Sequence, residues 1–387
     1  MRLAFTTSSF VYAGLPRPGL PIILGDDMSP VQPVQDFIIH KLLGQGKKLS
    51  PLTWTDYGRR LWDYFAFLDA NSIVWDDPSS VVGKGPVARY KAWSLTEAGV
   101  TARTLNSRLR LIAEFYEWAV QIGAIEAVPY GYEERRVSAR DQFLKHAVDH
   151  NATVERPDIF VQEWSSLPEF LAKEQVKACL ASVALKRASR RLLFDLMWRI
   201  GLRSCEARTF PLSYVFDPSK RPDCNPSRMI RIRLNPRDMT IKFDKPRDVD
   251  VPFSLMEALY AYTLYERNRL ASASTQEHSA LVLNEYGIPY SKDAVGDLFR
   301  ALSLKVGFRA TALMLRHSYA VHTLARLRNE SSFHGEPLLY VRDRLGHADV
   351  QTTAIYLSQI NQLASQLVLA IEDEFDRMFE MPAMQPQ

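Results

Sequence analysis

Apolar residues recur at three- and four-residue intervals through much of the chain, the spacing that places them on one face of an α-helix. In the N-terminal part, Ser50 and Pro51 suit the cap and the first position of such a helix, and Gly123 suits the end of another. The spacing predicts helices over residues 50–69, 87–93 and 102–122. Together they predict a helical bundle over residues 46–125.

The C-terminal half combines helical spacing with short stretches that alternate apolar with basic or polar residues. Such alternation is typical of half-exposed strands. It predicts strands over residues 229–234, 239–243 and 249–252. The helical spacing predicts helices over residues 173–185, 190–200, 254–270, 291–306, 316–327, 338–345 and 360–381. The sequence therefore predicts a mainly α protein with a small antiparallel β-sheet.

The length of 387 residues suggests two domains or three. Residues 1–45 contain a proline-rich run that cannot form regular helix, because proline lacks an amide donor, and we interpret them as an N-terminal arm. Residues 126–166 mix charged and aromatic residues without a period, which is typical of a linker. A second domain is predicted over residues 167–387, and it ends in a C-terminal helix.

Composition narrows the class of protein without choosing one. Hydrophobic residues make up 47% of the chain, which is enough for buried cores and too many for a disordered protein. The net charge of +4 permits nucleic-acid binding without requiring it. The three cysteines include no CxxC pair, so neither a disulfide framework nor a zinc site is expected, and a reducing cytoplasm fits best. We predict no signal peptide and no membrane-spanning helix, because no apolar run reaches about 18 residues.

Three polar residues near the C-terminus suggest chemistry on a phosphate: Arg316, His347 and Tyr356. The planar guanidinium of an arginine can bind two phosphate oxygens at once. A histidine can donate a hydrogen bond to the phosphate or move a proton near neutral pH. A tyrosine hydroxyl can attack phosphorus and hold it covalently. These residue types predict a phosphoryl-transfer site with a tyrosine nucleophile.

The spacing of these residues resembles the C-terminal signature of the tyrosine recombinases, the phage integrase family. That signature is an arginine within Leu-Arg-His-Ser/Thr-aromatic-Ala, then Leu-Gly-His, then a tyrosine nine residues after that histidine. Here residues 315–320 match the first part, residues 345–347 the second, and Tyr356 the third. Two further motifs match in the family's order: Gly-Leu-Arg-x-x-Glu at residues 201–206 and Lys-x-x-Lys-x-Arg at residues 242–247.

The resemblance implies a role for each motif. The implied catalytic residues are Arg203, Lys242, Arg316, His347 and Tyr356. Glu206 would orient Arg203 from behind. Lys242 would protonate the leaving 5′-oxygen, with Lys245 as the alternative lysine. Tyr356 would form a 3′-phosphotyrosine link that stores the energy of the phosphodiester, so neither a cofactor nor a metal is expected. The family usually has histidine or lysine three residues before the second arginine, where this chain has Leu313, which cannot donate a hydrogen bond.

A looser resemblance covers residues 104–118, which are similar to the end of the family's helical core-binding domain. It implies an N-terminal helical DNA-binding bundle joined to an α+β tyrosine-recombinase catalytic domain. Basic residues on the helices and in the lysine motif are then candidates for DNA contact: Arg59, Arg60, Arg103, Arg108, Lys245 and Arg247. A solvated basic edge is an equal alternative for Arg59 and Arg60.

The resemblance implies a site-specific DNA recombinase, an integrase or transposon recombinase, that acts on double-stranded DNA. Such an enzyme would work as a homo-tetramer on paired sites, with accessory proteins as further candidate partners. Its terminal helix would dock into a neighbouring subunit, and the alternative is that this helix packs on its own domain. Two alternatives remain open at this point. One is strand relaxation by a type IB topoisomerase-like enzyme. The other is a DNA-binding architectural partner whose chemistry is weakened at Leu313.

Overall fold

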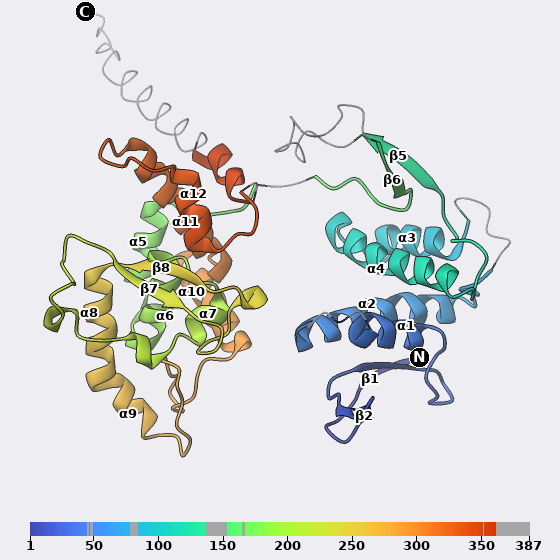
Figure 1. The fold of residues 1–387 in the computed structure, drawn as a ribbon, viewed down its shortest axis with the longest axis horizontal. Helices are drawn as coiled ribbons and strands as arrows, with labels where there is room; N and C mark the ends of the chain where they lie inside the picture. Colours follow the sequence, from blue (N-terminus) through green and yellow to red (C-terminus); the bar gives the residue numbers. More distant parts are fainter. Residues whose placement is uncertain are drawn as a thin grey trace, which may run out of the picture. The chain divides into compact units, whose positions relative to one another are not determined.

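The computed structural model describes residues 1–44, 46, 49–77, 84–136, 153–164, 167–350 and 352–360. The chain divides into two compact units, Met1–Ser165 and Ser166–Gln387 (Figure 1). Each unit has its own hydrophobic core. The predicted C-terminal helix over residues 360–381 lies, after Ile360, outside the described residues. Within the described part of the chain, no helix combines the length and the apolarity that crossing a membrane requires.

The N-terminal unit is built on helices that begin where the sequence places capping residues. They are α1 (Val34–Ile39), which a π-helical turn η1 (His40–Gly44) follows, α2 (Pro51–Ala70), α3 (Pro86–Thr96) and α4 (Ala102–Gln121). Ser50 caps α2 by accepting a hydrogen bond from Thr53 N, and Pro51 takes the first helical position. Thr101 caps α4 in the same way. Helices α2, α3 and α4 therefore begin close to their predicted positions.

Aromatic rings from three helices form the core of this unit. Phe65 of α2 packs edge-to-face against Phe115 of α4, with ring centroids 5.3 Å apart, and Phe37 of α1 packs on the same ring at 5.5 Å. The buried hydroxyls of Tyr64 and Tyr116 lie 2.7 Å apart, so each has a hydrogen-bonding partner. These rings are buried, so they stabilise the bundle and do not form an exposed stacking surface.

The described residues of the predicted arm, 1–44, fold as part of this unit and not as a separate arm. Strand β1 (Arg2–Phe5) pairs antiparallel with β4 (Pro21–Leu24), and β2 (Val11–Tyr12) pairs with β3 (Leu15–Pro16). Ile23 of β4 is fully buried in the helical core. A Cβ at Gly58 of α2 would come within 2.4 Å of Pro21, so this close packing requires glycine. The prolines limit the strands to short lengths, and the apolar residues among them pack on α2.

Part of the predicted linker, residues 126–166, also belongs to the N-terminal unit. Strand β5 (Tyr132–Arg136) pairs antiparallel with β6 (Thr153–Pro157) to form a hairpin. After the hairpin, Asn106 of α4 donates a hydrogen bond to Val161 O at 2.7 Å and accepts one from Val161 N at 2.8 Å. The described residues of this segment are therefore tied to α4 and do not behave as an independent connection.

The C-terminal unit surrounds a two-stranded sheet with helices (Figure 1). Strands β7 (Ile230–Leu234) and β8 (Arg247–Val251) pair antiparallel. The α-helices are α5 (Lys173–Ala181), α6 (Ala188–Arg199), α7 (Ser204–Arg208), α8 (Phe253–Tyr262), α9 (Asn268–Ala271), α10 (Lys292–Val306), α11 (Ala312–Asn329) and α12 (Pro337–Leu345), and residues 352–360 are also helical. Shorter 3₁₀ or π turns are η3 (Val183–Leu185), η4 (Leu212–Tyr214), η5 (Pro218–Lys220), η6 (Lys242–Asp244) and η7 (Thr263–Arg267). This mainly α architecture with small antiparallel sheets confirms the predicted fold class.

The predicted strand over residues 239–243 does not form. Ile241 is buried, but the chain then enters the η6 turn, in which Phe243 and Asp244 have positive φ angles of 67° and 50°. Pro246 follows and lacks the amide donor that a sheet ladder requires. Strand β8 therefore pairs directly with β7, and the residues between them include an exposed turn.

A separate apolar cluster joins the last helices of the C-terminal unit. It contains side chains from α11, α12 and the final helical segment: Tyr319, Ala320, Val321, Leu324, Val341, Leu345 and Tyr356. Tyr356 is only 2% exposed. The cluster packs the last of the predicted motifs against α11, the helix that carries Arg316.

Candidate active site

Arg316 lies at the centre of the site and links two loops that are far apart in the sequence. Its side chain is buried on α11, and its guanidinium donates hydrogen bonds to Gly201 O at 2.6 Å and to Leu345 O at 2.5 Å. Each of these carbonyls lies two residues before another candidate, Arg203 in one loop and His347 in the other. Arg316 therefore holds together the loops that carry the other two motifs.

Two glycines allow these loops to approach the centre. Gly201 has a φ of +71°, and a Cβ there would come within 2.5 Å of the Tyr319 ring. Gly346, which ends α12, has a φ of +65°, and a Cβ there would come within 2.6 Å of Arg247 Cδ. A side chain at either position would meet both a left-handed backbone and a packed neighbour.

Arg203 is held by a carboxylate that is buried behind it. Its backbone N–H donates to Glu206 Oε2 at 2.8 Å, and its guanidinium donates to Oε1 at 3.2 Å. Glu206 is fully buried and accepts two more hydrogen bonds from Arg247, at 2.8 and 2.6 Å. Burial acts to raise the pKa of the Glu206 carboxyl, but the hydrogen bonds and the charge of Arg247 lower it to about 2. Glu206 is therefore ionised at neutral pH and fixes Arg203 from the protein interior.

The sequence predicts that Arg247 contacts DNA, whereas the structure buries it. Arg247 is 6% exposed, its Nε donates to Arg344 O at 3.0 Å, and its two terminal nitrogens bind Glu206 as a fork. A guanidinium whose donors are engaged in this way is a structural partner of Glu206. Arg247 therefore acts on the site through Glu206 and Arg203.

His347 follows the left-handed end of α12 and stacks near the candidate nucleophile. Its Nδ1 lies 2.9 Å from Thr353 Oγ1, and its ring centroid lies 6.4 Å from that of Tyr356, with 26° between the planes. Burial lowers the pKa of His347 to about 3, and the charges of Arg316 and Arg203 act in the same direction. The imidazole is therefore neutral at neutral pH, and Thr353 occupies Nδ1, which leaves Nε2 for a ligand.

The hydroxyl of Tyr356 has a specific partner. It lies 2.8 Å from Nδ1 of His317, which is the residue after Arg316 on α11. Burial raises the pKa of Tyr356, whereas the guanidinium charges of Arg316 and Arg203 act to lower it. Burial, with the charge of Arg316, lowers the pKa of His317 to about 4, so its imidazole is neutral at neutral pH. A neutral imidazole nitrogen can accept a hydrogen bond from the phenol, and then its proton.

The residue types and motifs of the sequence give His317 no specific role. The only signal for it in the sequence is its place directly after Arg316, four residues after Leu313 on the same helix. Leu313 itself is 61% exposed in the first turn of α11. Only the packing of the final helix against α11 shows that the histidine next to Arg316 reaches the tyrosine hydroxyl.

The two lysines of the predicted lysine motif lie apart from this cluster. Lys242 and Lys245 are exposed, and Lys242 Nζ lies 4.9 Å from the centroid of the Phe243 ring. Within the described chain, neither lysine forms a hydrogen bond or an ion pair with the other catalytic candidates. The turn that carries them is still attached to the site, because Arg247 at the start of β8 binds Glu206.

The N-terminal arginines predicted to contact DNA differ in their surroundings. Arg59 on α2 and Arg103 on α4 are exposed. Arg60 instead forms an ion pair with a carboxylate one turn earlier, Asp56, and donates to Ser107 O at 3.0 Å. Arg59 and Arg103 therefore remain candidates for DNA contact, whereas Arg60 joins α2 to α4.

Arg108 is also used inside the N-terminal unit, although the sequence predicts a DNA contact. Its guanidinium donates to Asp63 Oδ2 at 2.6 Å and to the hydroxyl of Tyr90 at 3.1 Å. Tyr90 donates to the same carboxylate at 2.5 Å. The three side chains come from α4, α2 and α3, so Arg108 stabilises the packing of the bundle.

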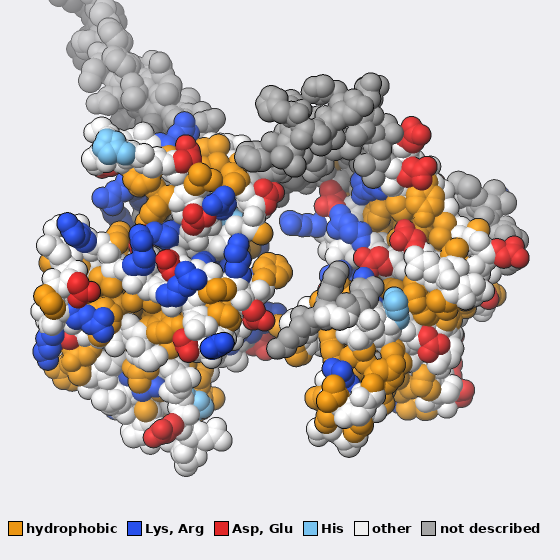
Figure 2. All heavy atoms as spheres, viewed as in Figure 1, with side chains coloured by type: hydrophobic (Ala, Val, Ile, Leu, Met, Phe, Trp, Pro, Cys, Tyr) orange, Lys and Arg blue, Asp and Glu red, His pale blue; other side chains and the backbone are white. Residues whose placement is uncertain are grey.

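Basic side chains gather on one face of the C-terminal unit, over β7, β8 and α12 (Figure 2). Arg231 and Arg233 of β7 are mostly exposed and lie 3.4 and 3.2 Å from Asp250 and Asp248 of β8. The carboxylates orient the guanidinium groups without covering them. This face therefore presents positive charge of the kind that binds a phosphate backbone.

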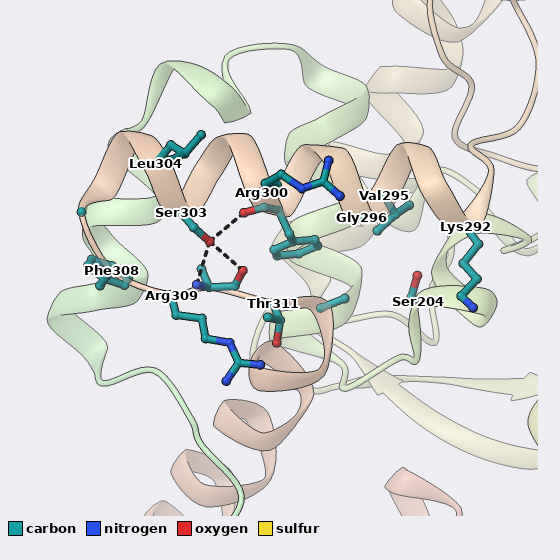
Figure 3. A pocket seen from close by; sticks show the side chains of 14 residues that line it. Ser204, Lys292, Val295, Gly296, Arg300, Ser303, Leu304, Phe308, Arg309 and Thr311 are labelled. Carbon is teal, nitrogen blue, oxygen red and sulfur yellow. Dashed lines mark hydrogen bonds between the residues drawn. The ribbon is translucent and has the colours of Figure 1, made fainter. Parts of the chain in front are cut away.

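A pocket of about 720 Å³ lies along α10. Figure 3 shows that its lining comes from α10 and from the segment that follows the helix. Ser303 Oγ accepts a hydrogen bond from Ala310 N at 2.9 Å, which holds that segment against the helix. Ser204, the neighbour of Arg203, lines the pocket, but none of the catalytic candidates does. The pocket is therefore distinct from the cluster around Tyr356.

The sequence is similar to known recombinases over most of its length. Transposase A from transposon Tn554 of Staphylococcus aureus is 24% identical over 376 residues, which cover 93% of this chain and 94% of that protein. Tyrosine recombinase XerC of Lacticaseibacillus casei (strain BL23) is 24% identical over 336 residues, which cover 85% of this chain and 93% of that protein.

Solved structures of recombinases share the fold. The XerH site-specific recombinase, in a post-cleavage complex with a palindromic difH substrate, matches with a TM-score of 0.54 at 17% identity, over 88% of this chain and 84% of that one. The Tn1549 transposon integrase, in complex with a circular intermediate DNA, matches with a TM-score of 0.52 at 15% identity, over 82% of this chain and 92% of that one.

The phage integrase family model matches residues 169–362. This stretch makes up half of the chain and contains Arg203, Lys242, Arg316, His347 and Tyr356. As the sequence predicts, this chain belongs to the phage integrase family, the tyrosine recombinases that cleave and rejoin DNA.

Proposed function

We propose that this chain is a site-specific DNA recombinase whose nucleophile is Tyr356. The proposal rests on the position of the Tyr356 side chain. Tyr356 and Arg316 are both buried, and the Tyr356 hydroxyl is hydrogen-bonded to His317, the residue next to Arg316. The charges of Arg316 and Arg203 both act on this hydroxyl. A DNA phosphate bound by Arg203, and by the N–H groups of Arg316 that Gly201 and Leu345 leave free, would therefore lie beside the nucleophile.

In the first step, the Tyr356 hydroxyl oxygen attacks phosphorus and the bond from phosphorus to the 5′-oxygen breaks. The neutral imidazole of His317 takes the phenol proton, and the ammonium of Lys242 gives a proton to the leaving 5′-oxygen. Arg203 and Arg316 offset the negative charge that builds on the phosphate oxygens, and His347 donates a hydrogen bond from Nε2 to the same group. The product is a 3′-phosphotyrosine link and a free 5′-hydroxyl.

The second step reverses the first with a different strand. The 5′-hydroxyl of the partner duplex gives its proton to Lys242 and attacks the phosphotyrosine, the bond from phosphorus to Tyr356 breaks, and His317 returns its proton to the phenol oxygen. One phosphodiester is formed for each one broken, so the strand transfer needs no external energy source. Glu206 and Arg247 contribute by keeping Arg203 in place through both steps, because a fixed donor needs no reorganisation as charge develops.

We propose that four copies of the chain act together. Each protomer supplies one tyrosine, and exchanging both strands of two duplexes requires four cleavages. The assembly would be a homo-tetramer with two protomers on each recombining site, and accessory proteins could set the direction of exchange. Because its substrate is DNA, we propose the cytoplasm as the compartment in which it acts.

Covalent trapping tests the nucleophile. The purified protein is incubated with a nicked duplex from the ends of its own genetic element, and the products are separated on a denaturing gel. We expect a protein–DNA adduct with the wild-type chain and none with Tyr356→Phe. An adduct that persists in Tyr356→Phe would show that another residue is the nucleophile.

The two alternative functions are separated by further readouts in the same assay. Relaxation of supercoiled plasmid without any sequence preference, and with no joint product between duplexes, would favour a topoisomerase-like enzyme. Sequence-specific binding without any adduct would favour an architectural partner. The neutral imidazole of His317 on the Tyr356 hydroxyl argues for chemistry, because it provides a proton acceptor that does not depend on Leu313.

A further inference from the structure

The turn that carries Lys242 has a backbone that its side chains do not favour. Phe243 and Asp244 both have positive φ angles, 67° and 50°, although neither is glycine. L-residues with a Cβ rarely adopt this region, and a bulky aromatic residue is an outlier there. Such strain persists only where the surrounding structure imposes it, and it often occurs at sites that bind a ligand.

The Phe243 ring does not offset this strain by packing. It is 81% exposed, and its described contact is with the Lys242 ammonium, 4.9 Å from the ring centroid. A phenylalanine buried in a core would offset a strained backbone by removing apolar surface from water. Here the apolar surface remains in solvent, so the ring contributes little to the stability of the unit.

Both ends of the turn are fixed to the catalytic cluster or to the core beside it. On one side, Ile241 is buried and Thr240 N donates to Thr209 Oγ1 at 3.0 Å. On the other side, Arg247 binds Glu206 at 2.6 Å. Arg247 is the fourth residue after Phe243, and a fully extended chain of that length spans at most roughly 14 Å. The exposed ring is therefore presented from a rigid base next to the residues that would bind the scissile phosphate.

We propose that Phe243 is a DNA-contact residue that inserts against the base step beside the cleaved phosphate. An apolar ring can unstack and wedge a base step, and flanking cations can bind the neighbouring phosphates. Phe243 lies between Lys242 and Lys245, both exposed, so one turn offers the ring and the charges together. The wedge would open the step at which strands exchange and would bring Lys242 to the leaving 5′-oxygen. This inference rests on the proposed function, because it takes the bound partner to be duplex DNA.

Variants of one position separate folding from DNA contact. Phe243→Gly removes the ring and relieves the positive φ, so its Tm should equal or exceed that of the wild-type chain. Phe243→Trp keeps an aromatic wedge at the same position. Tyr286→Ala is the matched control, because Tyr286 is also an exposed aromatic residue, 70% exposed, in a turn of the same unit.

The readout is 2-aminopurine fluorescence in a duplex that the wild-type chain protects in a footprint. The probe base is placed on either side of the protected scissile phosphate, and every variant is made in a Tyr356→Phe background so that cleavage does not disturb the signal. We expect fluorescence to rise on binding of the parent and of Phe243→Trp alike. It should stay flat with Phe243→Gly, whose affinity should fall about ten-fold. Tyr286→Ala should behave as the parent.

Two outcomes would overturn the inference. Binding and fluorescence unchanged in Phe243→Gly would mean that the ring does not touch DNA. Unchanged binding and fluorescence, combined with slower cleavage by Phe243→Gly in a chain that retains Tyr356, would mean that the ring only positions Lys242. The proposed function fails by a different result, an adduct that survives Tyr356→Phe, so the two failures are distinguishable.

Discussion

The Tyr356 hydroxyl lies 2.8 Å from Nδ1 of His317, a residue 39 positions earlier in the chain and next to Arg316. One helix, α11, therefore carries both the buried guanidinium and the imidazole that meet the final helical segment. A phenol at neutral pH needs a proton acceptor before it can attack phosphorus, since its ordinary pKa is near 10. The contact identifies His317 as the group that can serve this purpose.

Replacing His317 should slow cleavage without abolishing the nucleophile. We expect His317→Ala to lower the single-turnover cleavage rate about 100-fold, since general-base catalysis typically contributes this much or more. The residual rate should rise with pH, because hydroxide would replace the imidazole as the proton acceptor. His334→Ala, at an exposed histidine in the same unit, is the control. A wild-type rate and pH profile in His317→Ala would exclude the role.

Acid should destabilise the C-terminal unit through its buried histidines. The pKa values of His317 and His347 are lowered to about 4 and about 3 in the folded chain, against an ordinary value near 6.5. Between these limits the unfolded chain binds more protons than the folded one, so the free energy of unfolding falls as pH falls from about 6.5 toward 4. Urea unfolding across this range should show a smaller loss in His317→Gln than in the wild-type chain. An identical loss in both would contradict the prediction.

Removing the charge of Glu206 should cost more than removing that of a surface carboxylate. Glu206→Gln leaves the buried fork of Arg247 without its counter-ion, and we expect a loss of about 3–5 kcal/mol in unfolding free energy. Asp248→Asn, which disrupts the more exposed pair with Arg233, should change it by no more than about 1 kcal/mol. Chemical denaturation of the two variants measures the difference. Equal losses would show that the buried fork is not the stronger interaction.

Two glycines of the C-terminal unit should respond oppositely to alanine. Gly346→Ala adds a Cβ at positive φ and within 2.6 Å of Arg247 Cδ. It should therefore lower the free energy of unfolding by about 1–3 kcal/mol and weaken DNA cleavage. Gly296→Ala meets nothing within 4 Å on helix α10 and should stabilise the unit by about 0.5–1 kcal/mol. Thermal unfolding of the two variants measures both changes in stability. An unchanged Tm in Gly346→Ala would mean that Arg247 can move aside without loss of stability.

Two arginines of helix α4 should differ in what they affect. Arg103 is exposed, so Arg103→Ala should weaken DNA binding and reduce the slope of log affinity against log salt by about 1, with Tm unchanged. Arg108 is tied to Asp63 and Tyr90, so Arg108→Ala should lower Tm and leave the salt slope as it is. Fluorescence anisotropy at several salt concentrations, with Tm on the same samples, distinguishes them. A reduced salt slope in Arg108→Ala, with the slope unchanged in Arg103→Ala, would mean that Arg108 contacts DNA.

The sequence by itself determined most of the described helices, the order of the motifs and the family. Apolar spacing and capping residues are local properties, and they placed the start of α2 next to Ser50 and the start of α4 next to Thr101. The family motifs are likewise short, so Arg203, Arg316, His347 and Tyr356 could be named from residue type and spacing.

Only the tertiary structure decided what those residues contact. Arg316 meets the carbonyl of Gly201, 115 positions away, and Arg247 meets Glu206, 41 positions away, because packing brings their helices and strands together. An arginine in a motif looks the same in sequence whether it faces solvent or a carboxylate of its own unit, so the sequence predicts DNA contact for Arg108 and Arg247, whereas in the structure Arg108 pairs with Asp63 and Arg247 is buried against Glu206. The partnership of His317 with Tyr356 and the exposed ring of Phe243 have the same origin, since both depend on three-dimensional packing and backbone geometry that local spacing does not encode.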